Sequence, residues 1–261
     1  MFDLARFALR LLCGTSLMWC LLPRAKVSSG FFRIQMLVAL GLSVLGALAV
    51  SRAEAAGAGR AWDAVISAGM ARAGLIVLAG ASFLGSVLWT LERRAAGTFL
   101  VFAIACLSTV TLLLAMPSPV PIGGSVPAAY ASELSAAALL GSALAGMLLG
   151  HWHLTAPTMS LAPLERLAAV FGGTAVVRAV VAAACLWMAY HAIETSTHAV
   201  WLGLRWIAGI GAPLVLAVMV RRILRYRNTQ AATGVLFVAV ILTFIGEMTA
   251  LLLERDLGRP L

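Results

Sequence analysis

Eight apolar segments recur along this chain, and each is long enough to cross a lipid bilayer. A helix needs roughly 20 consecutive apolar residues to span about 30 Å of hydrocarbon. The segments lie at residues 5–22, 34–50, 73–91, 98–116, 132–150, 167–190, 199–220 and 231–253. Because lipid offers no hydrogen bonds to an open sheet, they predict an all-α polytopic bundle of about eight transmembrane helices. We expect residues 1–261 to form a single transmembrane domain.

The composition excludes a soluble fold of this length. Of the 261 residues, 62% are hydrophobic and 11% are charged, and the mean hydropathy is +1.00. A soluble domain of this size has no core large enough to hide so much apolar surface. The first segment begins with Arg6 and Arg10, as a signal peptide does, but Pro23 and Arg24 follow it in place of a small-residue cleavage site. We therefore expect it to be retained as a helix.

The formal net charge of +9 is unevenly distributed between the two membrane sides. Taken together, the connections after the first, third, fifth and seventh segments carry ten basic residues against Glu92 and Glu165, whereas basic and acidic residues balance on the other side. The basic residues of these connections are Arg24, Lys26, Arg33, Arg93, Arg94, Arg166, Arg221, Arg222, Arg225 and Arg227. The positive-inside rule then predicts a multi-pass protein of the cytoplasmic (inner) membrane with both termini outside. The charge indicates contact with membrane lipids and implies no nucleic acid.

Small residues and one proline indicate closely packed helices. Glycines are paired at close spacing in three segments, which favours close approach of backbones. The pairs are Gly80 with Gly85, Gly146 with Gly150, and Gly203 with Gly209. Pro213 follows Gly209 and Gly211, and it predicts a kink or an opened hydrogen-bond ladder in the seventh helix.

Three ionisable residues inside the last three segments are the candidate site. Arg178 lies in the middle of the sixth segment, Arg205 near the start of the seventh and Glu247 near the end of the eighth. A charge in hydrocarbon costs several kcal/mol unless it is paired or hydrated, so such residues face the bundle interior. We expect all three side chains to surround a polar chamber.

Depth along the helices predicts a pair between Arg205 and Glu247. At 1.5 Å per residue both residues lie about 9 Å from the same membrane surface, on antiparallel helices joined by a short turn. Such a pair is either a structural ion pair that fixes helix register or a catalytic pair in which Arg205 tunes Glu247. Arg178 lies about 18 Å deep, where it either pairs with Glu247 through water or binds an anionic or carbonyl-bearing ligand.

Histidines provide weaker candidates. His198 and Trp201 share the helix face of Arg205, so they are candidate ligand-binding residues. His191, Glu194 and His198 flank one turn and form a weak metal-ligand candidate, although interface histidines are usually only solvated. No histidine lies in the middle of a segment, which disfavours haem ligation within the membrane.

The overall pattern resembles the eight-helix membrane anchor subunits of the dimethyl sulfoxide reductase and polysulfide reductase type. The likeness rests on eight spans with outside termini and on a closing helix that runs from Arg227–Gln230 through Gly234 to Gly246 and Glu247. The resemblance implies quinol binding near the outer face and electron transport to an iron–sulfur partner.

Three functions are consistent with these patterns. The first is an integral-membrane subunit of a respiratory or related redox complex that binds quinone or quinol, in which Arg178 or His198 would hydrogen-bond a quinone carbonyl and Glu247 would take a proton. The second is a small proton-coupled transporter or exporter of an anionic solute, with a hinge between Gly209 and Pro213. The third is a non-catalytic scaffold or assembly subunit. Only the first requires protein partners that carry redox centres.

Overall fold

The computed structural model describes residues 2–55, 68–115, 125–156, 158–189 and 195–258. The chain divides into two compact units, residues 1–118 and 119–261. All regular structure in the described ranges is helical, and eight helices there are long and apolar enough to cross a membrane. The chain is therefore an all-α, multi-pass integral membrane protein, as the sequence predicts. The orientation of its termini stays a prediction.

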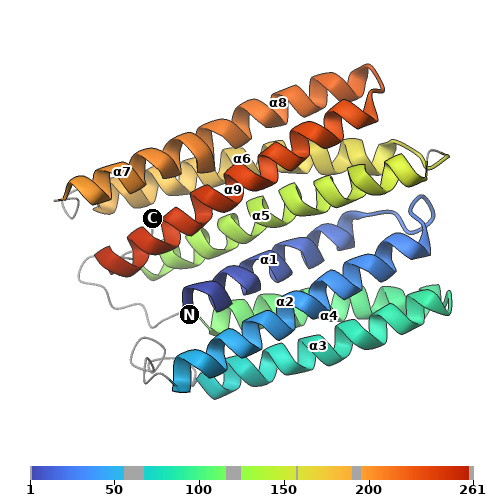
Figure 1. The fold of residues 1–261 in the computed structure, drawn as a ribbon, viewed down its shortest axis with the longest axis horizontal. Helices are drawn as coiled ribbons and strands as arrows, with labels where there is room; N and C mark the ends of the chain where they lie inside the picture. Colours follow the sequence, from blue (N-terminus) through green and yellow to red (C-terminus); the bar gives the residue numbers. More distant parts are fainter. Residues whose placement is uncertain (1, 56–67, 116–124, 157, 190–194, 259–261) are drawn as a thin grey trace. The chain divides into compact units, whose positions relative to one another are not determined.

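The first unit contains four antiparallel helices (Figure 1). They are α1 (Phe2–Leu21), α2 (Ser29–Ala55), α3 (Ala68–Thr90) and α4 (Arg94–Leu114). Each helix contacts its neighbours in sequence, and α4 also contacts α1, so the four close into a ring. Trp19 Nε1 donates to Gln35 Oε1 at 3.1 Å, which links α1 to α2, and the hydroxyls of Ser16 and Ser108 link α1 to α4 at 3.0 Å.

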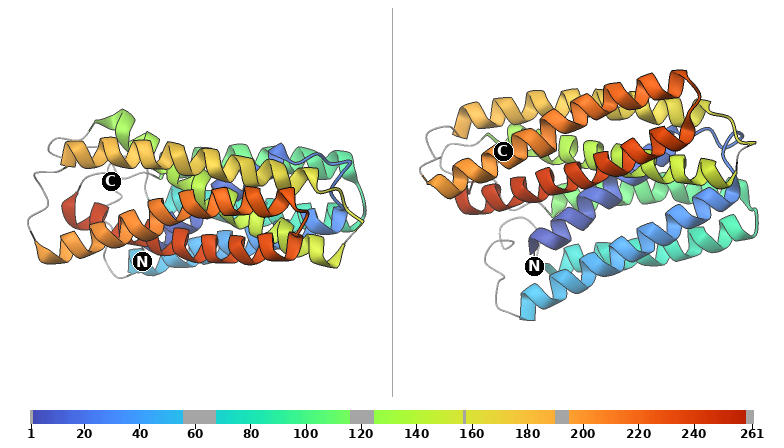
Figure 2. Two further views of the ribbon diagram at one scale, coloured as in Figure 1. Left: turned by 90° about the horizontal axis from the view of Figure 1, so that it is seen from above. Right: turned by 45° about the horizontal axis from the view of Figure 1, so that its top comes forward.

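The second unit closes in the same way, with one span divided into three parts. Its helices are α5 (Val126–Thr155), α6 (Ala162–Ala189), α7 (Ser196–Leu204), η3 (Arg205–Gly211), α8 (Ala212–Arg225) and α9 (Thr229–Leu257). The last span, α9, lies between α5 and α8 (Figures 1 and 2). Since α5 contacts α6 and α6 contacts α8 and η3, the helices α6 and α9 are diagonal across this ring.

The observed helices extend beyond most of the predicted segments. The fifth segment begins at Val126 instead of residue 132, and the eighth ends at Leu257 instead of residue 253. Caps explain several ends: the Ser125 side chain accepts from Ala128 N at 3.3 Å, Asn228 Oδ1 accepts from Ala231 N at 3.0 Å, and Gly258 ends α9 in the left-handed region with φ 63°. Polar residues near the predicted ends, including Ser132 and Glu254, therefore lie inside helices.

Close glycine packing is confirmed at some predicted positions and wrong at others. A Cβ on Gly150 would lie 2.6 Å from Thr233 Oγ1, and one on Gly85 would lie 2.8 Å from Met36 Sδ. A Cβ on Gly80 or Gly203 would meet nothing within 4 Å, so these two glycines do not mark a close approach.

Gly209 of η3 and Gly246 of α9 mark a close backbone approach in the second unit. A Cβ on Gly209 would lie 2.8 Å from the Cα of Gly246, and one on Gly246 would overlap the Cα of Gly209. The backbones therefore cross with no side chain between them, next to Glu247. Only glycine fits on both sides of such a crossing.

The predicted irregularity before Pro213 is confirmed as a π-helical segment. Residues Arg205–Gly211 form a π-helix, and Pro213 follows in the first turn of α8. Proline has no N–H and its ring displaces the carbonyl one turn earlier, so an α-helical ladder cannot continue unchanged. The wider turn rotates Arg205 and the residues before it relative to α8, and π-bulges of this kind are frequent at functional sites.

We predict that Gly246→Ala destabilises the second unit because the added methyl group overlaps the η3 backbone. The expected loss in unfolding free energy is about 1–3 kcal/mol or more, as for other overpacked interiors. Chemical unfolding of the purified protein in detergent measures it. Gly234→Ala is the matched control, since it lies on the same helix with nothing within 4 Å of the new methyl group. Equal stability of the two variants would contradict the backbone crossing.

Candidate functional site

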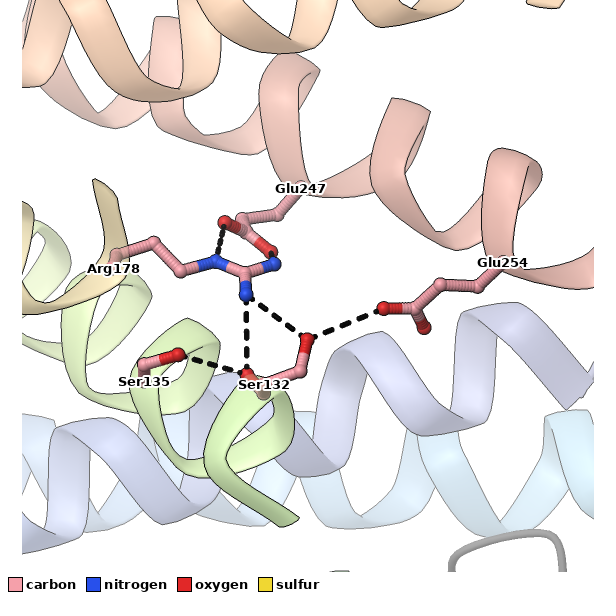
Figure 3. A network of polar contacts seen from close by, with 5 residues as sticks. All are labelled: Ser132, Ser135, Arg178, Glu247 and Glu254. Atoms are coloured by element: carbon pink, nitrogen blue, oxygen red, sulfur yellow. Dashed lines mark hydrogen bonds and ion pairs between the residues drawn. The ribbon is translucent and has the colours of Figure 1, made fainter. Parts of the chain in front are cut away.

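A buried ion pair lies at the centre of the second unit, and it joins Arg178 of α6 to Glu247 of α9 (Figure 3). Arg178 Nε donates to Glu247 Oε1 at 2.8 Å, and Arg178 Nη2 donates to Glu247 Oε2 at 2.9 Å. The side chains are 0% and 2% exposed. Two parallel charge-assisted hydrogen bonds fix both groups in one geometry. The pair spans the ring diagonally and therefore crosses its centre.

A second carboxylate is connected to this pair through Ser132 of α5. Arg178 Nη1 donates to the Ser132 hydroxyl at 3.0 Å and to the Ser132 carbonyl at 3.4 Å. The same hydroxyl donates to Glu254 Oε1 at 3.4 Å, and the Ser135 hydroxyl donates to the Ser132 carbonyl at 3.1 Å. Figure 3 shows the resulting chain from Glu247 through Arg178 and Ser132 to Glu254. It runs toward the end of the unit at which α9 finishes.

The helix faces explain why these residues converge. Glu247 and Glu254 lie seven positions apart on α9 and therefore share a face, which also carries the buried Thr243 and Ala250. Arg178 shares its face of α6 with the small buried residues Ala175 and Ala182. Small neighbours leave room for the long guanidinium side chain to reach across the bundle.

The predicted pair between Arg205 and Glu247 is wrong: Glu247 forms its two-bond ion pair with Arg178, and neither Nη1 nor Nη2 of Arg205 donates to it. Arg205 is nevertheless 2% exposed, and its Nη1 and Nη2 atoms have no hydrogen-bond partner. Its guanidinium lies within electrostatic reach of Arg178, Glu247 and Glu254. The prediction that all three charged side chains face the interior is confirmed. Arg205 is thus a buried donor group beside a completed pair.

The other predicted ligand residues lie outside the hydrogen-bonded network. His198 is partly buried, and its ring lies 6.3 Å from that of Trp201 at 45°. Trp201 packs against Leu253 of α9. His191 and Glu194 lie outside the described residues, so the weak metal candidate stays a prediction. Within the described ranges no group of three or more His, Cys, Asp and Glu side chains is arranged to hold a metal ion.

Sequence reasoning missed Ser132, Ser135 and Glu254. It counted Glu254 among the charges outside the membrane, because the eighth segment was expected to end at residue 253. The available signal was the seven-residue spacing to Glu247, which places both acids on one helix face. The two serines carry no charge and have no distinguishing pattern, so no sequence feature identifies them.

We predict strong non-additivity between Arg178→Gln and Glu247→Gln. Each single change leaves the opposite charge buried and unpaired, and we expect it to lower the unfolding free energy by about 3–5 kcal/mol. The double variant should lose clearly less than the sum of the two. Chemical unfolding of the wild type, both single variants and the double variant in detergent measures this double-mutant cycle.

The control cycle combines Arg205→Gln with Glu247→Gln. Arg205 forms no hydrogen bond to Glu247 through Nη1 or Nη2. The coupling energy between Arg205 and Glu247 should therefore be smaller than that between Arg178 and Glu247. An additive result for Arg178 with Glu247 would contradict the paired geometry.

Comparison with protein-family models, with curated proteins and with solved structures gives no match for this chain. The resemblance to eight-helix quinol-interacting anchor subunits therefore stays a prediction, and the geometry of the second unit is the basis for any functional proposal.

Proposed function

We propose that this chain is an integral-membrane subunit of a redox complex and that its second unit binds the headgroup of a quinone or quinol at Arg205. The observation that carries the proposal is the pair of buried, unpartnered donors Nη1 and Nη2 of Arg205. An unpartnered buried donor costs about 1–3 kcal/mol, and more for a charged group. A molecule that supplies acceptor oxygens there removes this cost on binding.

Charge balance favours a neutral ligand. Arg178 and Arg205 carry two positive charges, and Glu247 and Glu254 carry two negative charges when all four are ionised. Arg178 and Arg205 each lie within electrostatic reach of Glu247 and Glu254, so Arg205 lacks acceptors more than it lacks a counter-charge. A carbonyl oxygen supplies acceptor lone pairs without adding a net charge to a low-dielectric interior.

A quinone has the required properties. It is neutral, it carries two carbonyl acceptors, and its apolar tail keeps it dissolved in the bilayer that surrounds these helices. Oxidation of a quinol at this site would release two protons and two electrons. The carboxylates of Glu247 and Glu254 are the candidate proton acceptors, and an iron–sulfur partner subunit is the candidate electron acceptor.

The depth of the site supports ligand access from the membrane. Arg178, Arg205 and Glu247 each lie two to three turns from the end of the unit at which α9 finishes, roughly 14–17 Å at 1.5 Å per residue. This depth corresponds to one half of the hydrocarbon region, where the headgroup of a lipid-soluble quinone reaches buried polar groups.

The alternative is a proton-coupled transporter of an anionic solute. The observation in its favour is the π-helix Arg205–Gly211, which contains Gly209 of the crossing with Gly246 and precedes Pro213. Interrupted helices of this kind line many transport sites. An anion at Arg205 would disturb the charge balance unless a carboxylate took up a proton at the same time. Proton uptake on ligand binding therefore distinguishes the two functions.

We predict that the purified protein binds a short-chain ubiquinone or menaquinone analogue and that Arg205→Gln raises the dissociation constant about tenfold or more, as expected for loss of charge-assisted hydrogen bonds. Quenching of tryptophan fluorescence during titration measures binding. Arg222→Gln is the matched control, because Arg222 is exposed on the same span and loses the same charge.

Stability provides a second readout. Arg205→Gln should leave the ligand-free protein as stable as the wild type or more stable, because it removes an unsatisfied buried cation. A large loss of stability would indicate a structural role for Arg205.

Absence of quinone binding by the wild type would contradict the redox proposal. Proton-driven flux of inorganic phosphate or acetate into proteoliposomes would then support the transporter, and absence of both activities would support a scaffold.

A further inference from the structure

A second group of unsatisfied donors lies in the first unit, in and around the connection between α1 and α2. Arg24 Nη1 donates to the carbonyl of Trp19 at 2.7 Å and also to the carbonyl of Leu22. These bonds cap the end of α1. The guanidinium carbon lies 5.1 Å from the ring centroid of Phe32 on α2 and 5.6 Å from that of Phe102 on α4. Two aromatic rings and two carbonyls thus fix the position of Arg24.

Four nitrogen donors in this region have no partner. Two of them are Nε and Nη2 of Arg24, the third is Nε2 of Gln35 on α2, and the fourth is Nε1 of Trp89 on α3. Gln35 is 0% exposed and Trp89 is 2% exposed. The oxygen of Gln35 already accepts from Trp19 Nε1, which leaves only its amide nitrogen available. All four atoms require an acceptor.

Phe32 connects these donors into one group, called here the Arg24 cluster and defined as Arg24, Gln35 and Trp89. The Phe32 ring lies under Arg24 and stacks on Trp89 with centroids 4.6 Å apart and an interplanar angle of 19°. Phe32 and Gln35 are three positions apart on α2, so they share a face. Arg24 and Trp89 therefore both contact the Phe32 ring, and Gln35 lies about one helical turn from Phe32 on α2.

No carboxylate compensates Arg24 in the described part of the chain. Burial lowers the pKa of its guanidinium, and among the described residues the thiol of Cys20 acts on this pKa in the opposite direction. The connection between α3 and α4 at this end of the unit also carries the exposed pair Arg93–Arg94 beside the exposed Glu92. The local charge is therefore positive, and the cluster lacks both acceptors and negative charge.

We propose that the Arg24 cluster binds a phosphate-bearing anion, which is either the headgroup of an anionic phospholipid or free phosphate. Phosphate oxygens accept from the planar fork of an arginine, and an amide and an indole N–H add neutral donors. The cluster lies where α1 ends and α2 begins, at the edge of the apolar spans, where lipid headgroups lie. The site is separate from Arg205 and does not depend on the function proposed above.

The test uses the purified full-length protein in two arms. In the first arm, nanodiscs of phosphatidylcholine alone are compared with nanodiscs that also contain phosphatidylglycerol, by unfolding temperature and by native mass spectrometry of retained lipid. In the second arm, the protein in detergent is titrated with potassium phosphate against potassium chloride at equal ionic strength. A saturable rise in unfolding temperature in the first arm assigns a lipid headgroup, and a rise in the second assigns free phosphate. No response in either arm overturns the proposal.

Three variants separate a binding site from a structural cluster. Arg24→Gln should weaken binding of the responding probe about tenfold or more, and Trp89→Phe about fivefold, since it removes one neutral hydrogen bond and keeps the stacked ring. Lys26→Gln is the control, because it removes the same charge from an exposed position in the same connection. It should leave binding within about twofold, since an exposed charge is screened by salt. Equal losses for Lys26→Gln and Arg24→Gln, or unchanged binding in Trp89→Phe, would overturn the assignment.

Discussion

The hydrogen-bonded fork between Arg178 and Glu247 is the constraint on which the arrangement of the second unit depends. Removing two charges from water costs several kcal/mol per ion, and only good geometry with further hydrogen bonds recovers that cost. The fork has two bonds at 2.8 Å and 2.9 Å, and the third nitrogen of Arg178 reaches Ser132 at 3.0 Å. Because the fork joins diagonal helices, it fixes the rotation of α6 and α9 about their axes, and Ser132 adds α5 to the same interaction.

The span formed by α7, η3 and α8 differs from α6 and α9, because its buried arginine has incomplete hydrogen bonding. The π-helix between α7 and α8 contacts α9 at the Gly209–Gly246 crossing, which places η3 against the turn that carries Glu247. Arg205 begins this π-helix and is buried, but its Nη1 and Nη2 atoms have no hydrogen-bond partner, whereas Glu247 is paired with Arg178. The unit therefore combines a complete polar interaction with an incomplete one at the same depth. A completed pair suits a rigid framework, whereas an unsatisfied neighbour suits a position where a ligand completes the hydrogen bonding.

The sequence predicts most of the fold and only part of the site. The apolar segments identify all eight spans, and the cost of charge in lipid correctly predicts that Arg178, Arg205 and Glu247 face inward. The predicted pair between Arg205 and Glu247 is wrong for two reasons. The prediction assumed that charges on helices adjacent in sequence pair with each other, and it took the ends of the apolar segments as the helix ends. Longer helices place all three charges at a similar depth, so depth no longer separates Arg178 from Arg205. The choice between them depends on which side chain crosses the ring, and this is a property of the tertiary packing.

The two units use arginine in chemically different ways, and the difference follows from what surrounds each guanidinium. In the second unit, carboxylates on α9 neutralise the cations, so further ligand binding there adds hydrogen bonds and requires no net charge. In the first unit, aromatic rings and helix-end carbonyls hold Arg24, and neither carries a formal negative charge. A neutral acceptor therefore suits Arg205 in the second unit, and an anion suits Arg24 in the first unit. The same residue type therefore predicts two classes of ligand, because the missing component is an acceptor in one unit and a negative charge in the other.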